Sequence, residues 1–217
     1  MMKKPMSLNT AFILFILPLI TYTTNSYAKS PSPAVAKLAP QGWKVLISAE
    51  GDLNKDSLAD VAMIVEKLKP DIVVKDDDGK AIHNHPRQLM VFFKTVKGYQ
   101  NVATNTTIPV AETENSCLSD PLEETVHGLN IKNGVLSVDF NYFLSCGGWE
   151  WPRHSFTFRW QQNQFKLIGF NYNSFYRNTG EETSKSYNFS TLKAKIITGT
   201  NAFEGGKPKT TWTNFKA

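Results

Sequence analysis

Fifteen residues, Gly51 to Val65, organise the predicted fold, and they read Gly-Asp-Leu-Asn-Lys-Asp-Ser-Leu-Ala-Asp-Val-Ala-Met-Ile-Val. After the glycine, oxygen-bearing side chains alternate with other residues, and a short apolar run rich in valine and isoleucine follows at once. A run of this length and composition favours a strand over a helix. The sequence therefore predicts two strands, Trp43 to Ala49 and Ala59 to Leu68, joined by an acidic loop.

The acidic loop has the donor spacing of a calcium site. Its oxygen-bearing side chains are Asp52, Asn54, Asp56 and Asp60. Calcium accepts about six to eight oxygen atoms in loose geometry, and the backbone carbonyl of Leu58 would add one more. Without a cation, carboxylates crowded into so short a loop would repel one another. An EF-hand is not indicated, because a strand follows the loop and Met63 stands where that motif needs a glutamate.

The loop resembles the Asp-x-Asn-x-Asp-Gly-x-x-Asp calcium loop of FG-GAP and VCBS-type repeats, over Gly51 to Val65 only. The resemblance implies a β-rich fold and bound Ca2+, but no particular activity, because such repeats occur in adhesins, lectin-like modules and enzymes. One position departs from the pattern, since Ser57 stands where those loops usually carry glycine. A serine there implies backbone strain and weaker affinity. The alternative is a solvated acidic turn that binds no ion.

The amino end, residues 1–28, reads as a signal peptide. Lys3 and Lys4 precede an apolar run at residues 11–20, and the small residues Ser26 and Ala28 fit a cleavage site. That run is too short to cross a bilayer, and no second run is long enough. We therefore expect an exported protein, periplasmic or secreted, that does not span a membrane.

Cysteine content and charge narrow the class further. Cys117 and Cys146 are the two cysteines of the chain, and in an exported protein they are expected to form a disulfide. Without Lys3 and Lys4, the 24 basic residues become 22 against 19 acidic ones, a net charge of +3. So mild a charge, with no basic run, argues against nucleic-acid binding.

The rest of the chain predicts a predominantly all-β fold. Residues 29–41, rich in proline and alanine, read as a flexible leader, residues 42–199 as the β domain and residues 200–217 as a loose tail. Alternating segments at 88–104, 129–143 and 155–172 predict successive hairpins, with Asn133-Gly134 a strong turn signal. We expect an antiparallel meander forming a sandwich, a partial barrel or a propeller-like sheet. One short helix is expected from Ser119 to Gly128, where an aspartate cap precedes a proline.

The stretch around the second cysteine is the candidate recognition surface. Trp149, Glu150, Trp151 and Arg153 combine indoles with charges, which suits stacking on a sugar or anchoring a protein. The alternative is that the tryptophans only cover the end of the sheet. We expect a monomeric, non-enzymatic protein that binds a protein or glycan.

The alternative function is a cell-envelope hydrolase acting on glycans or peptidoglycan. Its candidate acid, base or nucleophile residues are Glu124, Asp139, Glu150 and His154. Two carboxyl groups about 5 to 9 Å apart in a concave site would favour that function.

Overall fold

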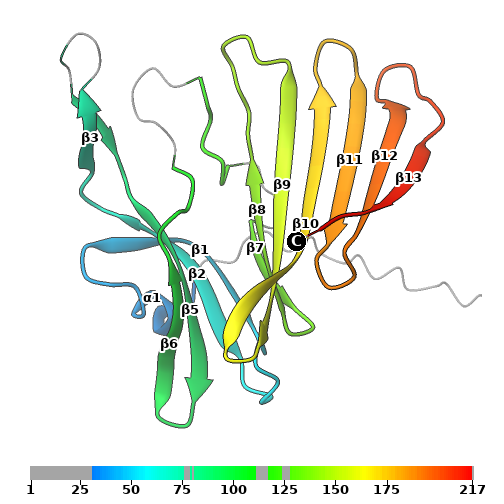
Figure 1. Ribbon diagram of the computed structural model, residues 1–217. Coiled ribbons are helices and arrows are strands. Elements are labelled where there is room, and N and C mark those ends of the chain that lie inside the picture. Colours follow the sequence, from blue (N-terminus) through cyan, green and yellow to red (C-terminus); the bar gives the residue numbers. More distant parts are fainter. Residues whose placement is uncertain (1–30, 76–78, 80, 111–116, 124–127, 217) are drawn as a thin grey trace, which may run out of the picture.

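The computed structural model of the chain describes residues 31–75, 79, 81–110, 117–123 and 128–216 (Figure 1). The expected signal peptide, residues 1–28, lies outside this range. The described elements are α1 (Pro33–Ala36), β1 (Trp43–Gly51), β2 (Asp60–Lys67), β3 (Asp71–Lys75), β4 (Ala81–Asn84), β5 (Arg87–Thr95), β6 (Gly98–Asn105), β7 (Leu129–Lys132), β8 (Val135–Asn141), β9 (Glu150–Gln161), β10 (Gln164–Tyr176), β11 (Glu181–Asn188), β12 (Lys193–Asn201) and β13 (Lys209–Asn214).

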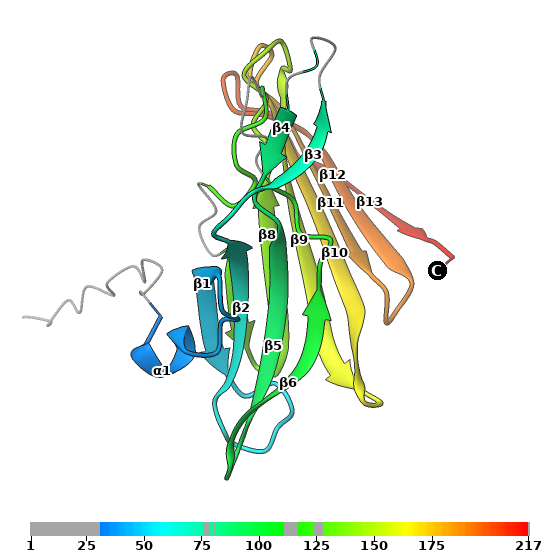
Figure 2. The ribbon, with the colours of Figure 1, turned by 90° about the vertical axis from the view of Figure 1, so that its left-hand side faces the viewer.

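The strands form two antiparallel sheets in a sandwich-like arrangement (Figures 1 and 2). The smaller sheet has the order β1-β2-β5-β6, the larger has the order β13-β12-β11-β10-β9-β8-β7, and β3 and β4 pair as a separate hairpin. Each strand of the larger sheet is thus the sequence neighbour of the strands beside it. The predicted antiparallel meander is confirmed.

Tight turns set the register of the meander. Asn133 and Gly134 have φ of 54° and 73°, and Gln162 and Asn163 have φ of 54° and 59°. Positive φ at both central residues is the signature of a type I′ turn, whose twist matches that of the flanking strands. The turn predicted at Asn133-Gly134 is confirmed, and Gln162-Asn163 makes the same turn without a glycine.

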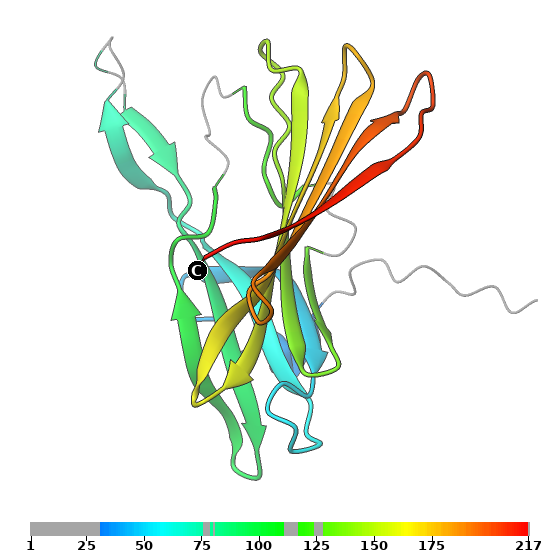
Figure 3. The ribbon, with the colours of Figure 1, turned by 45° about the vertical axis from the view of Figure 1, so that its right-hand side comes forward.

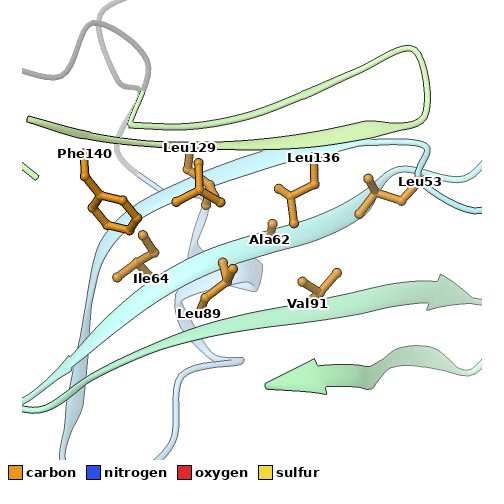
Figure 4. Packing of buried hydrophobic residues seen from close by; sticks show 9 residues of the cluster. Leu53, Ala62, Ile64, Leu89, Val91, Leu129, Leu136 and Phe140 are labelled. Carbon is orange, nitrogen blue, oxygen red and sulfur yellow. The ribbon is translucent and has the colours of Figure 1, made fainter. Parts of the chain in front are cut away.

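The main core lies between the two sheets (Figure 4). From the smaller sheet come Ala62, Ile64, Leu89 and Val91, and from the larger come Leu129, Leu136, Val138 and Phe140. Leu53, from the acidic loop, reaches the same cluster and is 1% exposed. Burying a large aliphatic side chain contributes about 1.5 to 3 kcal/mol, so these side chains hold the sheets together.

A second core covers the outer face of the smaller sheet. Val61, Met63 and Val65 of β2 pack there with Val35 of α1, which is 1% exposed. Ser32 caps this short helix by accepting a hydrogen bond from the backbone nitrogen of Val35. The segment expected as a flexible leader, residues 29–41, therefore contains an ordered turn of helix, because Val35 and Leu38 supply apolar cover that β2 lacks.

The larger sheet extends beyond the smaller one, so that β11, β12 and β13 fan away from it (Figure 3). β13 lies within the segment expected to be a loose tail. Residues 209–214 are rich in β-branched threonine, which suits an extended strand at a sheet edge. Phe215 then packs edge-on against Tyr187 and Phe189.

The helix expected at Ser119 to Gly128 is not present in its described part. Residues 121–123 form a turn, and residues 124–127 lie outside the described range. Asp120 does act as a cap, since its carboxylate accepts a 3.0 Å hydrogen bond from the nitrogen of Leu122. The carbonyl oxygen of Pro121 accepts a 2.8 Å hydrogen bond from the backbone nitrogen of Asn141, so this turn is paired with β8.

Arg87 joins the Asp120 turn to the smaller sheet. Its guanidinium contacts the Asp120 carboxylate at 2.6 and 2.5 Å and Glu66 of β2 at 2.9 and 2.8 Å. Lys44 also pairs with Glu66, at 2.9 Å. Burial alone would raise the pKa of the Glu66 carboxyl, but the hydrogen bonds from Lys44 and Arg87 outweigh it and lower that pKa. The pKa of Asp120 is lowered by Arg87 against the same opposing effect of burial.

Replacing Arg87 by methionine is expected to destabilise the fold by about 3 to 5 kcal/mol at neutral pH, because two carboxylates would lose their buried partner. The lowered carboxyl pKa values mean that this stabilisation is present above the ordinary values of 4.5 and 3.8 and is lost as pH falls through the folded-state values. The difference in free energy of unfolding between the parent protein and Arg87→Met, measured by urea denaturation, should therefore narrow below about pH 4.

The exposed pair Lys67–Asp71 provides the control, since its atoms approach to 2.6 Å with side chains 38% and 50% exposed. Lys67→Met should change stability by less than about 1 kcal/mol. An equal effect of both substitutions would contradict the role given to Arg87.

Candidate functional site

Two regions carry the candidate functional residues: the acidic loop between β1 and β2, and the surface around Trp151. They lie toward opposite ends of the molecule (Figure 1). In the acidic loop, the Asp52 carboxylate accepts backbone hydrogen bonds from Lys55 at 2.6 Å, Asp56 at 3.2 Å and Ser57 at 2.9 Å. The loop is therefore folded around the Asp52 side chain.

Asn54 and Asp56 lie beside each other in the same loop. The Asn54 amide nitrogen donates to Asp56 Oδ2 at 2.9 Å, and the backbone nitrogen of Asp56 donates to Asn54 Oδ1 at 3.1 Å. Ser57 has φ of 68°, in the left-handed region that glycine adopts without strain. This is the position where the resemblance noted above expects glycine.

Asp60 differs from the other acidic residues because it is fully buried, with 0% exposure. Its two carboxylate oxygens accept hydrogen bonds from the backbone nitrogens of Leu53, at 2.8 Å, and Lys94, at 2.9 Å. Burial is the main cause of a raised Asp60 pKa, and the charge of Asp56 raises it further. Within the described residues Asp60 makes no ion pair.

The donor set of the loop fits a hard cation in part. Three of the predicted ligands, Asp52, Asn54 and Asp56, lie near the surface. Asp60 lies in the interior, and Leu58, whose backbone carbonyl was the other predicted ligand, is 38% exposed. Among the described residues, no group of three or more His, Cys, Asp or Glu side chains is gathered as a metal site. A cation would therefore be held by carboxylate and amide oxygens of Asp52, Asn54 and Asp56 and by a backbone carbonyl.

The loop before β9 is fixed at several points. The disulfide Cys117–Cys146 ties it to the segment before Asp120, which confirms the expected pairing. Arg177, just after β10, donates to the carbonyls of Leu144, at 2.7 Å, and Gly148. Its guanidinium also lies 4.6 Å from the centre of the Phe143 ring. This loop therefore reaches Trp151 in one defined conformation.

Trp151 stands between two cavities on the outer face of the larger sheet. Its indole nitrogen donates a 2.6 Å hydrogen bond to Asn141 Oδ1, and its ring meets Phe143 edge-on. One cavity, of about 460 Å³, is lined by Trp151, Phe175, Arg153, Asn173, Glu182 and Ser184, among others. A smaller cavity, of about 190 Å³, lies toward Asp120 and Glu123.

The four residues predicted as one recognition surface do not all lie together. Trp151 and Arg153 share the outer face and line the larger cavity. Glu150 points to the inner face, where it accepts a hydrogen bond from the Tyr172 hydroxyl. Trp149 lies in the preceding loop and is 57% exposed.

Eight residues that line this cavity were not predicted from the sequence, and Asn173, Phe175 and Glu182 are three of them. Strand pairing brings them beside the predicted residues. Asn173 of β10 pairs with Arg153 of β9, and Phe175 pairs with Trp151. Glu182 of β11 in turn pairs with Phe175. The alternation of 171–176 could have placed Asn173 and Phe175 on one face. The register that puts this face beside Trp151 depends on a bulge between Leu167 and Gly169.

The hydrolase candidates are divided between the two faces of the larger sheet. Glu150 and His154 belong to the inner face, where burial lowers the pKa of His154 and His154 contacts the rings of Tyr142 and Phe170. Asp139 pairs with Ser155 on the outer face. Glu124 lies outside the described residues.

Comparisons with protein-family models, with curated protein sequences and with solved structures each found no match. Within the described part of the chain, no helix combines the length and apolar character needed to cross a membrane.

The Cys117→Ser/Cys146→Ser double variant should lose about 3 to 4 kcal/mol of stability, because the disulfide closes a loop with a sequence separation of 29 residues. Chemical denaturation of the oxidised protein and the variant measures this difference. A variant as stable as the oxidised protein would mean that Arg177 alone fixes the loop.

Proposed function

We propose that this chain is an exported, non-enzymatic binding protein that holds a sugar residue of a glycan in the cavity beside Trp151. In this proposal Ca2+ stabilises the acidic loop at the other end of the molecule. The observation that carries the proposal is the make-up of the 460 Å³ cavity, in which two aromatic rings face amide, hydroxyl and charged groups.

The cavity has the chemistry that a sugar ring requires. A sugar presents an apolar face of C–H groups and a rim of hydroxyl groups, so it needs a flat ring on one side and hydrogen-bonding groups around it. Trp151 and Phe175 supply the rings. Asn173, Ser184 and Thr200 can each donate and accept hydrogen bonds, and Arg153 and Glu182 add one donor and one acceptor group. The volume lies in the range of about 300 to 1,000 Å³ that is usual for small-ligand sites.

A glycan fits this surface better than a protein partner does. Protein interfaces are centred on apolar hot spots, whereas in this cavity amide, hydroxyl and charged groups surround the two rings. The fixed loop also favours a small ligand: because the disulfide and Arg177 already hold Trp151 in place, little ordering entropy is lost on binding.

Two further features support a binding role in an oxidising compartment. Disulfides such as Cys117–Cys146 are typical of proteins outside the cytosol, in agreement with the expected signal peptide. Glu150 and Asp139 face opposite sides of the sheet, so they do not form the paired carboxylates that glycoside hydrolysis needs.

The calcium part of the proposal is supported by the charge balance of the acidic loop. Asp60 is buried and has a raised pKa, and the negative charge of Asp56 acts on it. A cation held by Asp52, Asn54 and Asp56 would offset this repulsion and favour the ionised form of Asp60. The backbone strain at Ser57 is expected to make the affinity modest.

The glycan site is tested by Arg153→Ala and Asn173→Ala, since both side chains are exposed and line the cavity. In a binding screen of mature protein against neutral and acidic oligosaccharides, each substitution should weaken binding by about tenfold, the equivalent of about 1.4 kcal/mol. Trp149→Ala, in the preceding loop and outside the cavity, should leave affinity unchanged. Binding lost only in Trp149→Ala, or in none of the three, would remove the cavity from the proposal.

The calcium site is tested by thermal unfolding with excess chelator and then with millimolar calcium. Calcium at a hundred times its dissociation constant should increase the free energy of unfolding by about 2.7 kcal/mol. For a domain of this size, that raises Tm by roughly 5 to 10 °C. The Asp52→Ala/Asp56→Ala variant should show no rise in Tm with calcium. The Ser57→Gly variant should reach the full rise in Tm at a lower calcium concentration, because glycine removes the backbone strain.

A matched control is Glu181→Ala/Glu204→Ala, which removes the same charge from exposed positions elsewhere. This variant should keep the full rise in Tm. A rise of equal size in the Asp52→Ala/Asp56→Ala protein, or no rise in the parent chain, would leave the loop an ordinary acidic turn.

A further inference from the structure

We propose that the outer face of the larger sheet binds an acidic polysaccharide chain, which runs across the strands from the Trp151 cavity to a second contact at Trp212 and Lys193. This inference rests on the proposed function, because it extends the same glycan site and specifies its ligand. It concerns β9 to β13, all of which lie in the described part of the chain.

The outer face is lined by side chains that suit sugars. Paired residues of successive strands form a row across it, and this row is Asp139, Ser155, Asn171, Ser186, Lys195 and Trp212. Every member except Trp212 carries a polar or charged group. Polar side chains therefore continue without interruption from the strand beside the cavity to the edge of the sheet.

The opposite, inner face has a different composition. The row that lies beside the first one on that face is Val138, Phe156, Phe170, Tyr187, Ala194 and Thr213. These rings pack on one another, with centroids 5.0 Å apart for Phe156 and Phe170 and 6.0 Å for Phe170 and Tyr187. In these two neighbouring rows, the inner face presents packed rings and the outer face presents hydrogen-bonding groups.

The far end of the outer face has its own aromatic contact. Trp212 is 65% exposed, although it belongs to a strand, and Lys195 lies over its ring at 5.9 Å. A hollow beside it, of about 690 Å³, is lined by Lys193, Trp212, Thr213 and Asn214. A tryptophan ring thus lies next to polar groups at both ends, half-buried at Trp151 and exposed at Trp212.

The charge at this end selects an acidic ligand. Residues 189–217 contain five lysines and one acidic residue, Glu204. Lys193 and Lys195 fall on the outer face, opposite Asn214 and Trp212. At the cavity the positive charge of Arg153 is offset by Glu182, so the preference for an acidic ligand comes from Lys193 and Lys195. A chain of uronic acid sugars would place carboxylates near these groups and rings against the tryptophans.

The distance requires a chain and not a single sugar. β9 and β13 are separated by four strand spacings of about 4.8 Å, or about 19 Å across the sheet, and Trp151 lies four residues, about 13 Å, along β9 from Ser155, whose row leads to Trp212. A monosaccharide can fill either end, but only a polymer can occupy both. A polymer that binds at both ends has a higher overall affinity than a ligand that binds at either end alone. The reason is that, once one end is bound, the second contact forms within the same complex.

The test uses polygalacturonate, its fully methyl-esterified form and monomeric galacturonate as probes, with binding measured by calorimetry. The unmodified chain should bind the acidic polymer about tenfold or more tightly than the esterified polymer or the monomer, and added salt should weaken this binding. Lys193→Gln/Lys195→Gln and Trp212→Ala should each weaken binding of the acidic polymer by about tenfold. All three side chains lie at or near the surface, and circular dichroism verifies that the variants fold.

The matched control is Lys207→Gln/Lys209→Gln, which removes the same charge from the same hairpin. Lys207 lies in the turn of this hairpin, and Lys209 lies on the face of the sheet away from Lys195. It should change affinity by less than about twofold. An equal loss in both double variants would overturn the proposal, because it would mean attraction to any polyanion. Equal or tighter binding to double-stranded DNA or to vesicles containing phosphatidylglycerol would overturn it as well.

The two proposals fail in different ways. If oligosaccharides bind and depend on Arg153 and Asn173, but polymer length, charge and Trp212 have no effect, the extended chain site is wrong and the cavity stands. If the polymer binds through Trp212 and Lys193 while Arg153→Ala and Asn173→Ala leave its affinity intact, both the cavity and the path that starts from it are wrong. If none of the probes binds, neither proposal survives.

Discussion

The fold depends on one strand, β2, being covered on both faces. Val61, Met63 and Val65 face α1, and Ala62 and Ile64 face the larger sheet, all with 0% exposure. In a sheet, a shift of one residue exchanges the two faces. Here a shift would move Asp60 and Glu66, which flank the apolar run, relative to their hydrogen-bonding partners. The register of β2 is thus fixed by a buried carboxylate at each end as well as by the apolar run between them.

This arrangement leaves the larger sheet covered over only part of its inner face. β7, β8 and β9 contribute to the core between the sheets, whereas β11 to β13 lie beyond the smaller sheet (Figure 1). Phe170, Tyr187 and Phe215 cover the remainder of that face by packing on one another, with ring centroids 6.0 and 5.6 Å apart. Between Trp151 and Trp212 the outer face carries the polar side chains on which both proposals rest.

Local signals predicted much of this structure, and the misses have physical causes. Period-two alternation identified the hairpins, Asn133-Gly134 identified a turn, and the cysteine count identified the disulfide. The helix expected after Asp120 was wrong for residues 121–123, whose turn is instead paired with β8 by a hydrogen bond from the backbone nitrogen of Asn141 to the Pro121 carbonyl. The cavity could be predicted only in part, since Asn173 and Glu182 join Trp151 through a register that a bulge displaces by one residue.

The separation of the acidic loop from the cavity limits what calcium could do. The loop lies beside the β7–β8 turn, because a Cβ placed on Gly134 would lie 3.5 Å from the Lys55 side chain, and Leu53 enters the core. The cavity lies toward the other end of the larger sheet, beside the turn between β10 and β11 (Figure 1). Packed strands transmit little change of shape over this distance unless an element has two alternative arrangements, and among the described residues none that lines the cavity belongs to the loop. A cation at Asp52 and Asp56 would therefore act on the fraction of folded protein and leave the intrinsic affinity of the cavity for its ligand unchanged.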